Sequence, residues 1–163
     1  MILSQPLPTA AEAEAGFPAT VPADWGQGRT TYGGFSTALA LRAALALGGA
    51  ELPPLRSALV SFVGPVHGAV TLRARKLRQG RNATWITAEV LCGDNVGLAA
   101  TFVFMGPTSS TLDVHRIALP AGVLAPEDSA DIPMRPKFPT FRGLLDVRPA
   151  LPRELRQDTE LCW

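Results

Sequence analysis

The 163-residue sequence predicts an α+β fold in which an antiparallel sheet wraps around one long central helix. Three observations predict it. Residues 35–47 form an alanine- and leucine-rich segment with few polar side chains, four strand-like segments follow in succession, and the breaks between them are short and rich in glycine. Short turns join antiparallel neighbours. A sheet with one apolar face can bury that face against a single helix.

The first 34 residues predict an arm and a loop. Residues 1–23 are rich in alanine, proline and threonine without a clear period, so we expect a loose arm with one short strand near residues 19–21. Residues 24–34 contain four glycines and predict a loop that leads into the helix. We place the main domain at residues 24–106.

The helix at residues 35–47 is predicted to be buried. Alanine and leucine are strong helix formers, and Gly48-Gly49 followed by Pro53-Pro54 ends the segment. A helix that is apolar nearly all the way round is usually a core helix.

The strand-like segments are residues 57–63, 69–79, 83–92 and 97–105. In the third segment Ile86 and Ala88 alternate with Thr87 and Glu89, which is typical of a sheet with one buried face. The fourth is apolar on both faces, so we expect it to be central or covered on both sides.

Residues 107–163 have a different character, with much of the proline and little regular period. We expect a strand or turn at residues 109–118 and a linker at 121–138. Strand fragments are expected at 144–147 and 159–163, and the last of these ends the sequence within an apolar segment.

Composition excludes several function classes. The net charge is only +1, which gives no general field for nucleic acid or an anionic membrane. The longest apolar segment is shorter than the roughly 20 residues of a membrane span, and the N-terminus lacks the basic region of a secretory signal. Two cysteines, Cys92 and Cys162, fit a reducing cytoplasm. Together with His67 and His115, which we interpret as surface residues, they have no metal-site spacing.

The strongest candidate site is the start of the predicted helix. The first N–H groups of a helix have no internal partner and carry partial positive charge. Gly33 and Gly34 allow a thioester carbonyl or a phosphate oxygen to approach that backbone closely. A tight structural turn is the competing interpretation. The Ser36 and Thr37 hydroxyls can bond a ligand or the first helical turn.

Other candidates come from outside the helix, which contains no Asp, Glu or His. Asp24 is the candidate general base, although a turn or capping role competes. Arg78 and Arg81, which flank Gly80, can meet the phosphates of a large anionic cofactor. Charged residues of an exposed turn are the alternative.

Four segments in this order resemble the N-terminal half of a TesB-like (type II) acyl-CoA thioesterase: residues 32–44, 55–66, 77–82 and 99–104. In that family a Gly-Gly pair opens the central helix and a Leu-Arg-x-Gly-Arg turn joins two long strands. The resemblance covers residues 24–106. It implies the hotdog fold and a thioester of coenzyme A as substrate, with coenzyme A as part of that substrate and no separate cofactor.

The resemblance also implies site residues. It places Gly33 and Gly34 at the helix start near the thioester, with Tyr32 and Phe35 as neighbours. The family's catalytic Asp, Thr and Gln lie in a second hotdog unit, and residues 143–149 and 159–163 resemble the opening strand of such a unit. We therefore expect a homo-oligomer or association with a second hotdog unit.

Two functions remain open at this point. One is hydrolysis of an acyl-CoA thioester; the other is a non-catalytic acyl-CoA-binding or scaffold half that completes a partner. A dehydratase is disfavoured because no Asp-x-x-x-x-His spacing occurs near the helix start.

Overall fold

The computed structural model describes residues 2–114, 118, 120–129, 132–133 and 135–152. The chain divides into two compact units, residues Met1–Thr108 and Ser109–Trp163.

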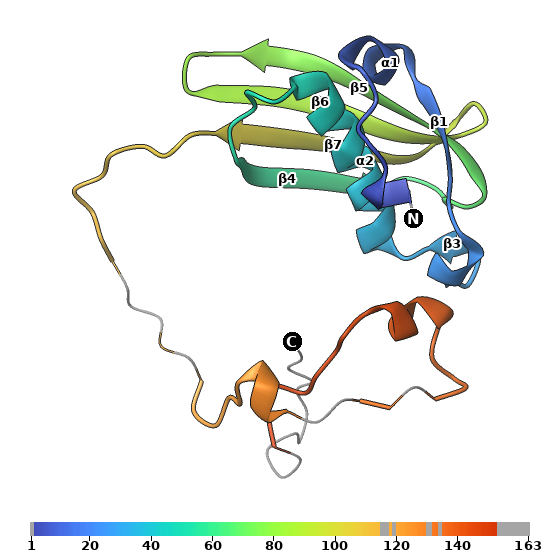
Figure 1. The fold of residues 1–163 in the computed structure, drawn as a ribbon, viewed down its shortest axis with the longest axis vertical. Helices are drawn as coiled ribbons and strands as arrows, with labels where there is room; N and C mark the ends of the chain where they lie inside the picture. The colour runs from blue at the N-terminus through green and yellow to red at the C-terminus, as the bar shows by residue number, and fades with distance from the viewer. Residues whose placement is uncertain (1, 115–117, 119, 130–131, 134, 153–163) are drawn as a thin grey trace. The chain divides into compact units, whose positions relative to one another are not determined.

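The first unit is an antiparallel sheet with one long helix against it (Figure 1). In its described residues the sheet has five strands in the order β1-β5-β6-β7-β4. The elements are β1 (Phe17–Thr20), α2 (Gly33–Gly48), β4 (Leu55–Phe62), β5 (Ala69–Gln79), β6 (Ala83–Cys92) and β7 (Asn95–Met105). The fold class predicted from the sequence is confirmed.

The core lies between α2 and the inner face of the sheet. The helix packs mainly against β5, β6 and β7. On α2 the side chains of Phe35 and Leu39 are fully buried, together with several alanines that let the sheet approach closely. From the sheet, Leu72, Ile86 and Phe102 are buried against them. The alternation of apolar and polar residues in β5 and β6 therefore sets which sheet face meets the helix.

The predicted bounds of β5 and β6 agree with the structure at both ends. The helix begins at Gly33, two residues earlier than expected, and β7 begins at Asn95, also two residues earlier. At the helix the added residues are Gly33 and Gly34, and at β7 they are Asn95 and Val96; both pairs continue a regular element that the prediction interpreted as a loop.

The expectation of a loose arm at residues 1–23 is wrong in part. Residues Ala10–Ala15 form the short helix α1, closed by a capping box between Thr9 and Glu12. The Glu12 carboxylate accepts hydrogen bonds from the Thr9 hydroxyl and backbone N–H, both at 2.7 Å. These bonds, the side-chain one first, lower the pKa of Glu12. β1 follows at once and pairs with β5.

Arg42 ties the beginning of the chain to α2. The sequence suggests only a polar interruption of the helix, but this side chain is 7% exposed. Its guanidinium donates to the carbonyl of Gln5 at 2.8 Å and to that of Pro6. Its Nε is buried without a hydrogen-bond partner among the described residues.

Replacing Arg42 by leucine is expected to free residues 2–6 from the helix. Hydrogen bonds from a charged donor contribute about 1.5–3 kcal/mol each. The leucine variant loses the two bonds that hold the carbonyls of Gln5 and Pro6 against α2. Limited proteolysis should cut this segment several times faster in Arg42→Leu. The control is Arg81→Leu, a change at an exposed turn. Equal cutting rates in the two variants would contradict this assignment.

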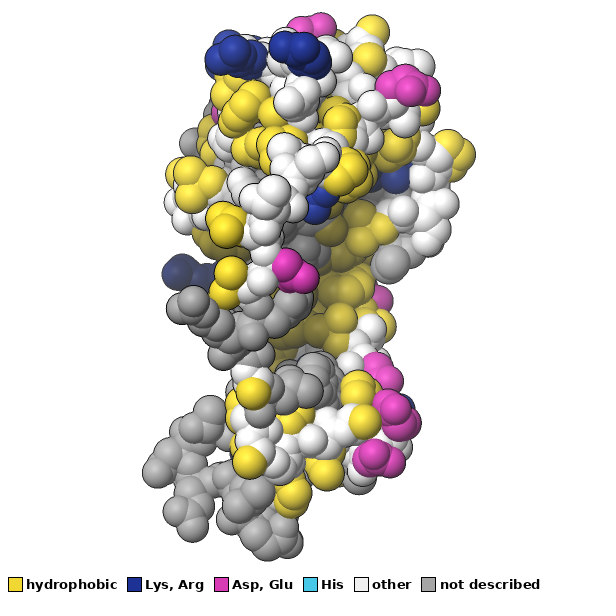
Figure 2. Space-filling model, turned by 90° about the vertical axis from the view of Figure 1, so that its left-hand side faces the viewer, with side chains coloured by type: hydrophobic (Ala, Val, Ile, Leu, Met, Phe, Trp, Pro, Cys, Tyr) yellow, Lys and Arg dark blue, Asp and Glu magenta, His cyan; other side chains and the backbone are white. Residues whose placement is uncertain are grey.

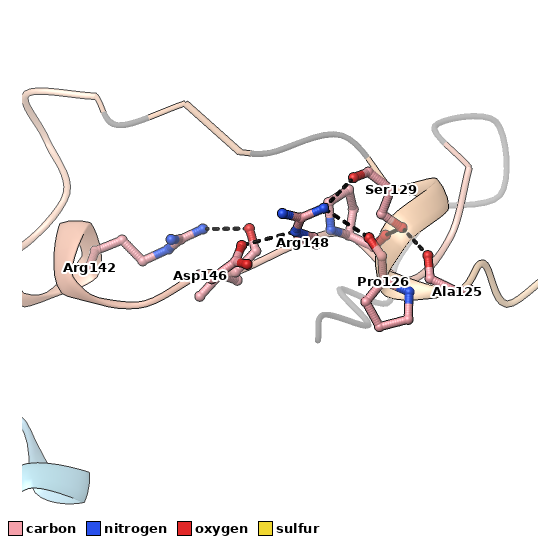
Figure 3. A network of polar contacts seen from close by, with 8 residues as sticks. Ala125, Pro126, Ser129, Arg142, Asp146 and Arg148 are labelled. Carbon is pink, nitrogen blue, oxygen red and sulfur yellow. Dashed lines mark hydrogen bonds and ion pairs between the residues drawn. The ribbon is translucent and has the colours of Figure 1, made fainter.

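The second unit contains short 3-10 helices and irregular backbone. In the described residues these are η3 (Pro126–Asp128) and η4 (Thr140–Leu144). Figure 3 shows the polar contacts that hold it together: Arg148 donates to the Asp146 carboxylate at 3.0 Å and to the Pro126 carbonyl at 3.1 Å. The Ser129 hydroxyl donates to the Pro149 carbonyl at 2.8 Å.

The strand expected at residues 144–147 is wrong, because Leu144 ends η4 and residues 145–148 are irregular. A short apolar segment forms a regular strand only where another strand pairs with its backbone. Residues 109–114 and 118 also have no regular strand. Residues 115–117, with His115, and residues 159–163, with Cys162, lie outside the described residues.

Candidate functional site

The loop before α2 is a small folded structure. It contains a 3-10 turn, η2 (Ala23–Trp25), and a short hairpin of β2 (Gly26–Gln27) and β3 (Thr30–Thr31). The hairpin turns at Gly28, whose φ of +66° suits glycine.

Long-range hydrogen bonds fix β3 beside the segment that follows β4. The Thr31 N–H donates to the Val66 carbonyl at 2.8 Å, and the Thr30 hydroxyl accepts from the Val66 N–H at 3.0 Å. The Tyr32 N–H donates to the Trp25 carbonyl at 2.9 Å, which closes the loop on itself. The segment after β4 is therefore held close to the start of α2.

An aromatic cluster holds the start of α2 in place. The ring of Trp25 stacks on Phe35 with 4.6 Å between centroids and on Tyr32 with 6.3 Å. Phe35 is 1% exposed. The Phe35 ring therefore packs α2 against the loop that contains Trp25.

The first turn of α2 has no side-chain cap. The carbonyl of Tyr32 accepts from the N–H groups of Phe35 and Ser36, at 3.0 and 3.2 Å. The hydroxyls of Ser36 and Thr37 both donate to the Gly33 carbonyl. Both hydroxyls therefore bond the first helical turn, which was the alternative to binding a ligand. Each hydroxyl oxygen can still accept a hydrogen bond.

The amides of Gly33 and Gly34 donate to none of the described residues. Both positions are also closely packed. A Cβ at Gly33 would lie 3.0 Å from the Phe62 ring, and one at Gly34 would lie 2.5 Å from the ring of Tyr32. Packing alone therefore favours glycine at both positions, whatever the amides bind.

A groove of about 870 Å³ lies at this helix start. Apolar side chains of the β4 end and the following segment form one wall, and hydroxyl groups of β3 and α2 form another. The lining residues are Gln27, Arg29, Thr30, Thr31, Gly33, Ser36, Phe62, Val63, Gly64, Pro65, Val66 and His67. None of them is an Asp or Glu, so the lining of this groove brings no carboxylate to the helix start.

The structure brings only some of the predicted site residues together. Gly33 and Ser36 line the groove, whereas Gly34, Tyr32 and Phe35 adjoin Gly33 without lining it. Asp24 is exposed in η2 and is not a lining residue.

Arg81 lies at the other end of the sheet from the groove. It is in the turn from β5 to β6, beside Ala83, which pairs with Met105 at the end of the sheet where β4 begins. The groove is where β4 ends. Basic side chains gather over the β5–β6 end (Figure 2), where Lys76, Arg78 and Arg81 are exposed.

Sequence reasoning missed Arg29 and Thr31 in the groove and treated His67 as an ordinary surface residue. These residues come together in the groove only because β3 contacts Val66, and that contact joins residues more than thirty positions apart in the sequence. No local pattern signals that contact.

Known structures share this architecture. A hotdog-fold protein of unknown function from Alicyclobacillus acidocaldarius matches with a TM-score of 0.69 and 23% identity, over 82% of this chain and 50% of that one. A protein proposed to be a thioesterase II from Thermobifida fusca matches with a TM-score of 0.61 and 18% identity, over 82% of this chain and 50% of that one. A protein proposed to be a thioesterase from Novosphingobium aromaticivorans matches with a TM-score of 0.63 and 20% identity, over 83% of this chain and 55% of that one. The chain spans about half the length of these proteins.

The fold is therefore the hotdog fold. The family model of the acyl-CoA thioesterase N-terminal domain matches residues 21–105, and the chain belongs to that family. No curated protein matches the sequence significantly. No helix in the described part of the chain combines the length and the apolar character needed to cross a membrane. The described residues also hold no cluster of three or more His, Cys, Asp or Glu suited to a metal ion.

Proposed function

We propose that the chain takes part in hydrolysis of acyl-CoA thioesters, as a TesB-like (type II) member of the thioesterase superfamily, in the cytoplasm. The observation that supports this most is the groove at the uncapped start of α2. There the amides of Gly33 and Gly34 donate to none of the residues that the structure describes, and apolar side chains line the groove beside them. Membership of the acyl-CoA thioesterase N-terminal domain family adds the substrate class.

In the proposed reaction the thioester carbonyl accepts hydrogen bonds from these amides. The amides and the helix dipole stabilise the negative charge that develops on the carbonyl oxygen. Water attacks the carbonyl carbon, the carbon–sulfur bond breaks, and coenzyme A leaves as the thiol after its sulfur takes up a proton. The products are a free acid and coenzyme A.

The attacking water needs a proton acceptor, which the groove lining does not supply as a carboxylate. Asp24 stays our candidate within this chain, since it precedes the loop and its carboxylate is exposed. Arg81 stays a candidate for the phosphates of coenzyme A, but only for a groove of another unit, because its own groove lies at the far end of the sheet. A second hotdog unit is the partner we propose.

The lack of a lining carboxylate is also what favours the alternative, an acyl-CoA-binding or scaffold half. In that case the groove binds the thioester and the second unit carries out the chemistry.

Release of free thiol from acyl-CoA thioesters of several chain lengths tests the proposal. We expect saturable release by the purified chain, and a loss of at least about tenfold in kcat for Asp24→Asn. Full activity in Asp24→Asn would remove Asp24 from the mechanism. Binding of acyl-CoA without any release would favour the scaffold alternative, and neither binding nor release would refute both.

A further inference from the structure

The charged groups that line the groove at the start of α2 are all basic. Arg29 is the one permanently charged residue of the lining, and His67 is the other lining residue that can carry positive charge. No Asp or Glu of the lining offsets them, and the remaining lining residues are apolar or neutral polar. A groove of this composition favours a ligand that carries negative charge.

The contacts of β3 place both basic residues at the same end of the groove. At the helix start Gly33 lies against Phe62, since a Cβ at Gly33 would come within 3.0 Å of the Phe62 ring. Earlier in the chain, β3 donates a backbone hydrogen bond at 2.8 Å to the carbonyl of Val66. The two walls therefore run antiparallel. Arg29 precedes β3 and His67 follows Val66, so both lie at the end away from the helix start.

The backbone around these residues is fixed, whereas their side chains have no partner in the fold. The Val66 N–H donates to a hydroxyl of β3 at 3.0 Å, and the Gly68 carbonyl accepts from the Val21 N–H at 2.8 Å. Hydrogen bonds thus hold the chain on both sides of His67. The side chains of Arg29 and His67 are exposed and make no hydrogen bond or ion pair with the residues that the structure describes.

We propose that Arg29 and His67 form a subsite for the diphosphate of coenzyme A, in the same groove that receives the thioester. This inference rests on the proposed function, in which the thioester lies at the amides of Gly33 and Gly34. Arg29 lies four residues before Gly33, a backbone span of at most roughly 14 Å. The extended pantetheine arm, which joins the sulfur to the diphosphate, has a comparable length, and the long arginine side chain makes up a small difference.

The chemistry of the two side chains suits phosphate oxygens. A guanidinium is always charged and presents paired N–H donors that match two phosphate oxygens. The imidazole adds a further N–H donor. Between the two ends of the groove lie the hydroxyls of Thr30 and Thr31 and the amide of Gln27. These neutral groups can exchange hydrogen bonds with the amide groups of the pantetheine arm.

Thioesters with and without phosphate test the subsite. Acyl-CoA carries the diphosphate, whereas an S-acyl pantetheine with the same acyl group keeps the thioester and has no phosphate. For acyl-CoA we expect Arg29→Gln to raise KM roughly five- to tenfold and His67→Ala to raise it less, with kcat within about twofold of wild type. For the acyl pantetheine both variants should match the wild type, because the contact that they lose involves phosphate only.

The matched control is Arg75→Gln, a change at an exposed arginine of β5 that does not line the groove. It should leave both KM values unchanged. An unchanged KM for acyl-CoA in Arg29→Gln would overturn the proposal. So would a loss of activity that is equal for the two thioesters, since Arg29 would then act on the thioester end or on the fold.

Calorimetric titration with coenzyme A alone separates this inference from the proposed function, because free coenzyme A carries the diphosphate and is not hydrolysed. The wild type should bind it, Arg29→Gln should bind it several-fold more weakly, and added salt should weaken wild-type binding more than that of the variant. This result without thiol release from any thioester would support the subsite and refute the hydrolysis. No binding by the wild type, or equal binding by both proteins, would refute the subsite, and continued thiol release would then leave the proposed function standing.

Discussion

The Gly33→Val variant is expected to lose at least about a hundredfold in kcat/KM for acyl-CoA hydrolysis while it remains folded. A side chain at this position projects toward the Phe62 ring, which a Cβ would approach to 3.0 Å. Phe62 is exposed and can move by a few tenths of an ångström. The added methyl groups then occupy the groove where the thioester carbonyl must approach the amide. Loss of one donor to a developing oxyanion costs about 10²–10³ in rate.

Steady-state thiol release measures this effect, with Gly106→Val as the control. Gly106 belongs to the same unit, and a Cβ there meets nothing within 4 Å. The control should keep wild-type kcat/KM. An active Gly33→Val variant would mean that Gly33 is required only for packing.

The Phe35→Ala variant is expected to lower the free energy of unfolding by about 3–5 kcal/mol. Phe35 is buried between the helix and the Trp25 ring, so its removal leaves a cavity between loop and helix. The loss is a large part of the roughly 5–15 kcal/mol that stabilises a typical domain. Denaturant unfolding measures it. Leu77→Ala, an exposed position of β5, is the control and should change stability by no more than about 0.5 kcal/mol.

This variant also separates two interpretations of Phe35. The family resemblance suggests a neighbour of the substrate, whereas the structure buries the ring against Trp25 and leaves it out of the groove lining. If Phe35 acts through packing, Phe35→Leu should recover most of the stability and activity together. A variant with native stability and a raised KM would instead favour contact with the substrate.

Periodicity predicted most of the sheet because β5 and β6 alternate strictly and their turns are short. The same reasoning missed α1, although the Thr9-x-x-Glu12 capping box before an alanine-rich segment is a visible helix start. It also predicted a strand at residues 144–147, where the structure has the last residue of η4 and irregular backbone.

The candidate site was predictable at the helix start and nowhere else. Gly33 and Ser36 follow from the glycine pair and the beginning of the helix. Arg29 and His67 reach the same groove only because β3 bonds to Val66. A long-range pairing of two residues leaves no trace in local composition. Arg81 has the right chemistry for phosphates, but register places it at the other end of its own sheet.

The most direct test of the central claim is to follow the backbone amide signals of the chain by NMR while a non-hydrolysable analogue of acyl-CoA is added, in which a methylene group between the sulfur and the carbonyl carbon keeps the carbonyl and prevents hydrolysis. If the groove at the start of α2 holds the thioester, the largest shifts will fall on the amides of Gly33 and Gly34, with smaller ones at residues 64–66. Shifts confined to another surface, with the two glycine amides unchanged at saturation, would contradict the account.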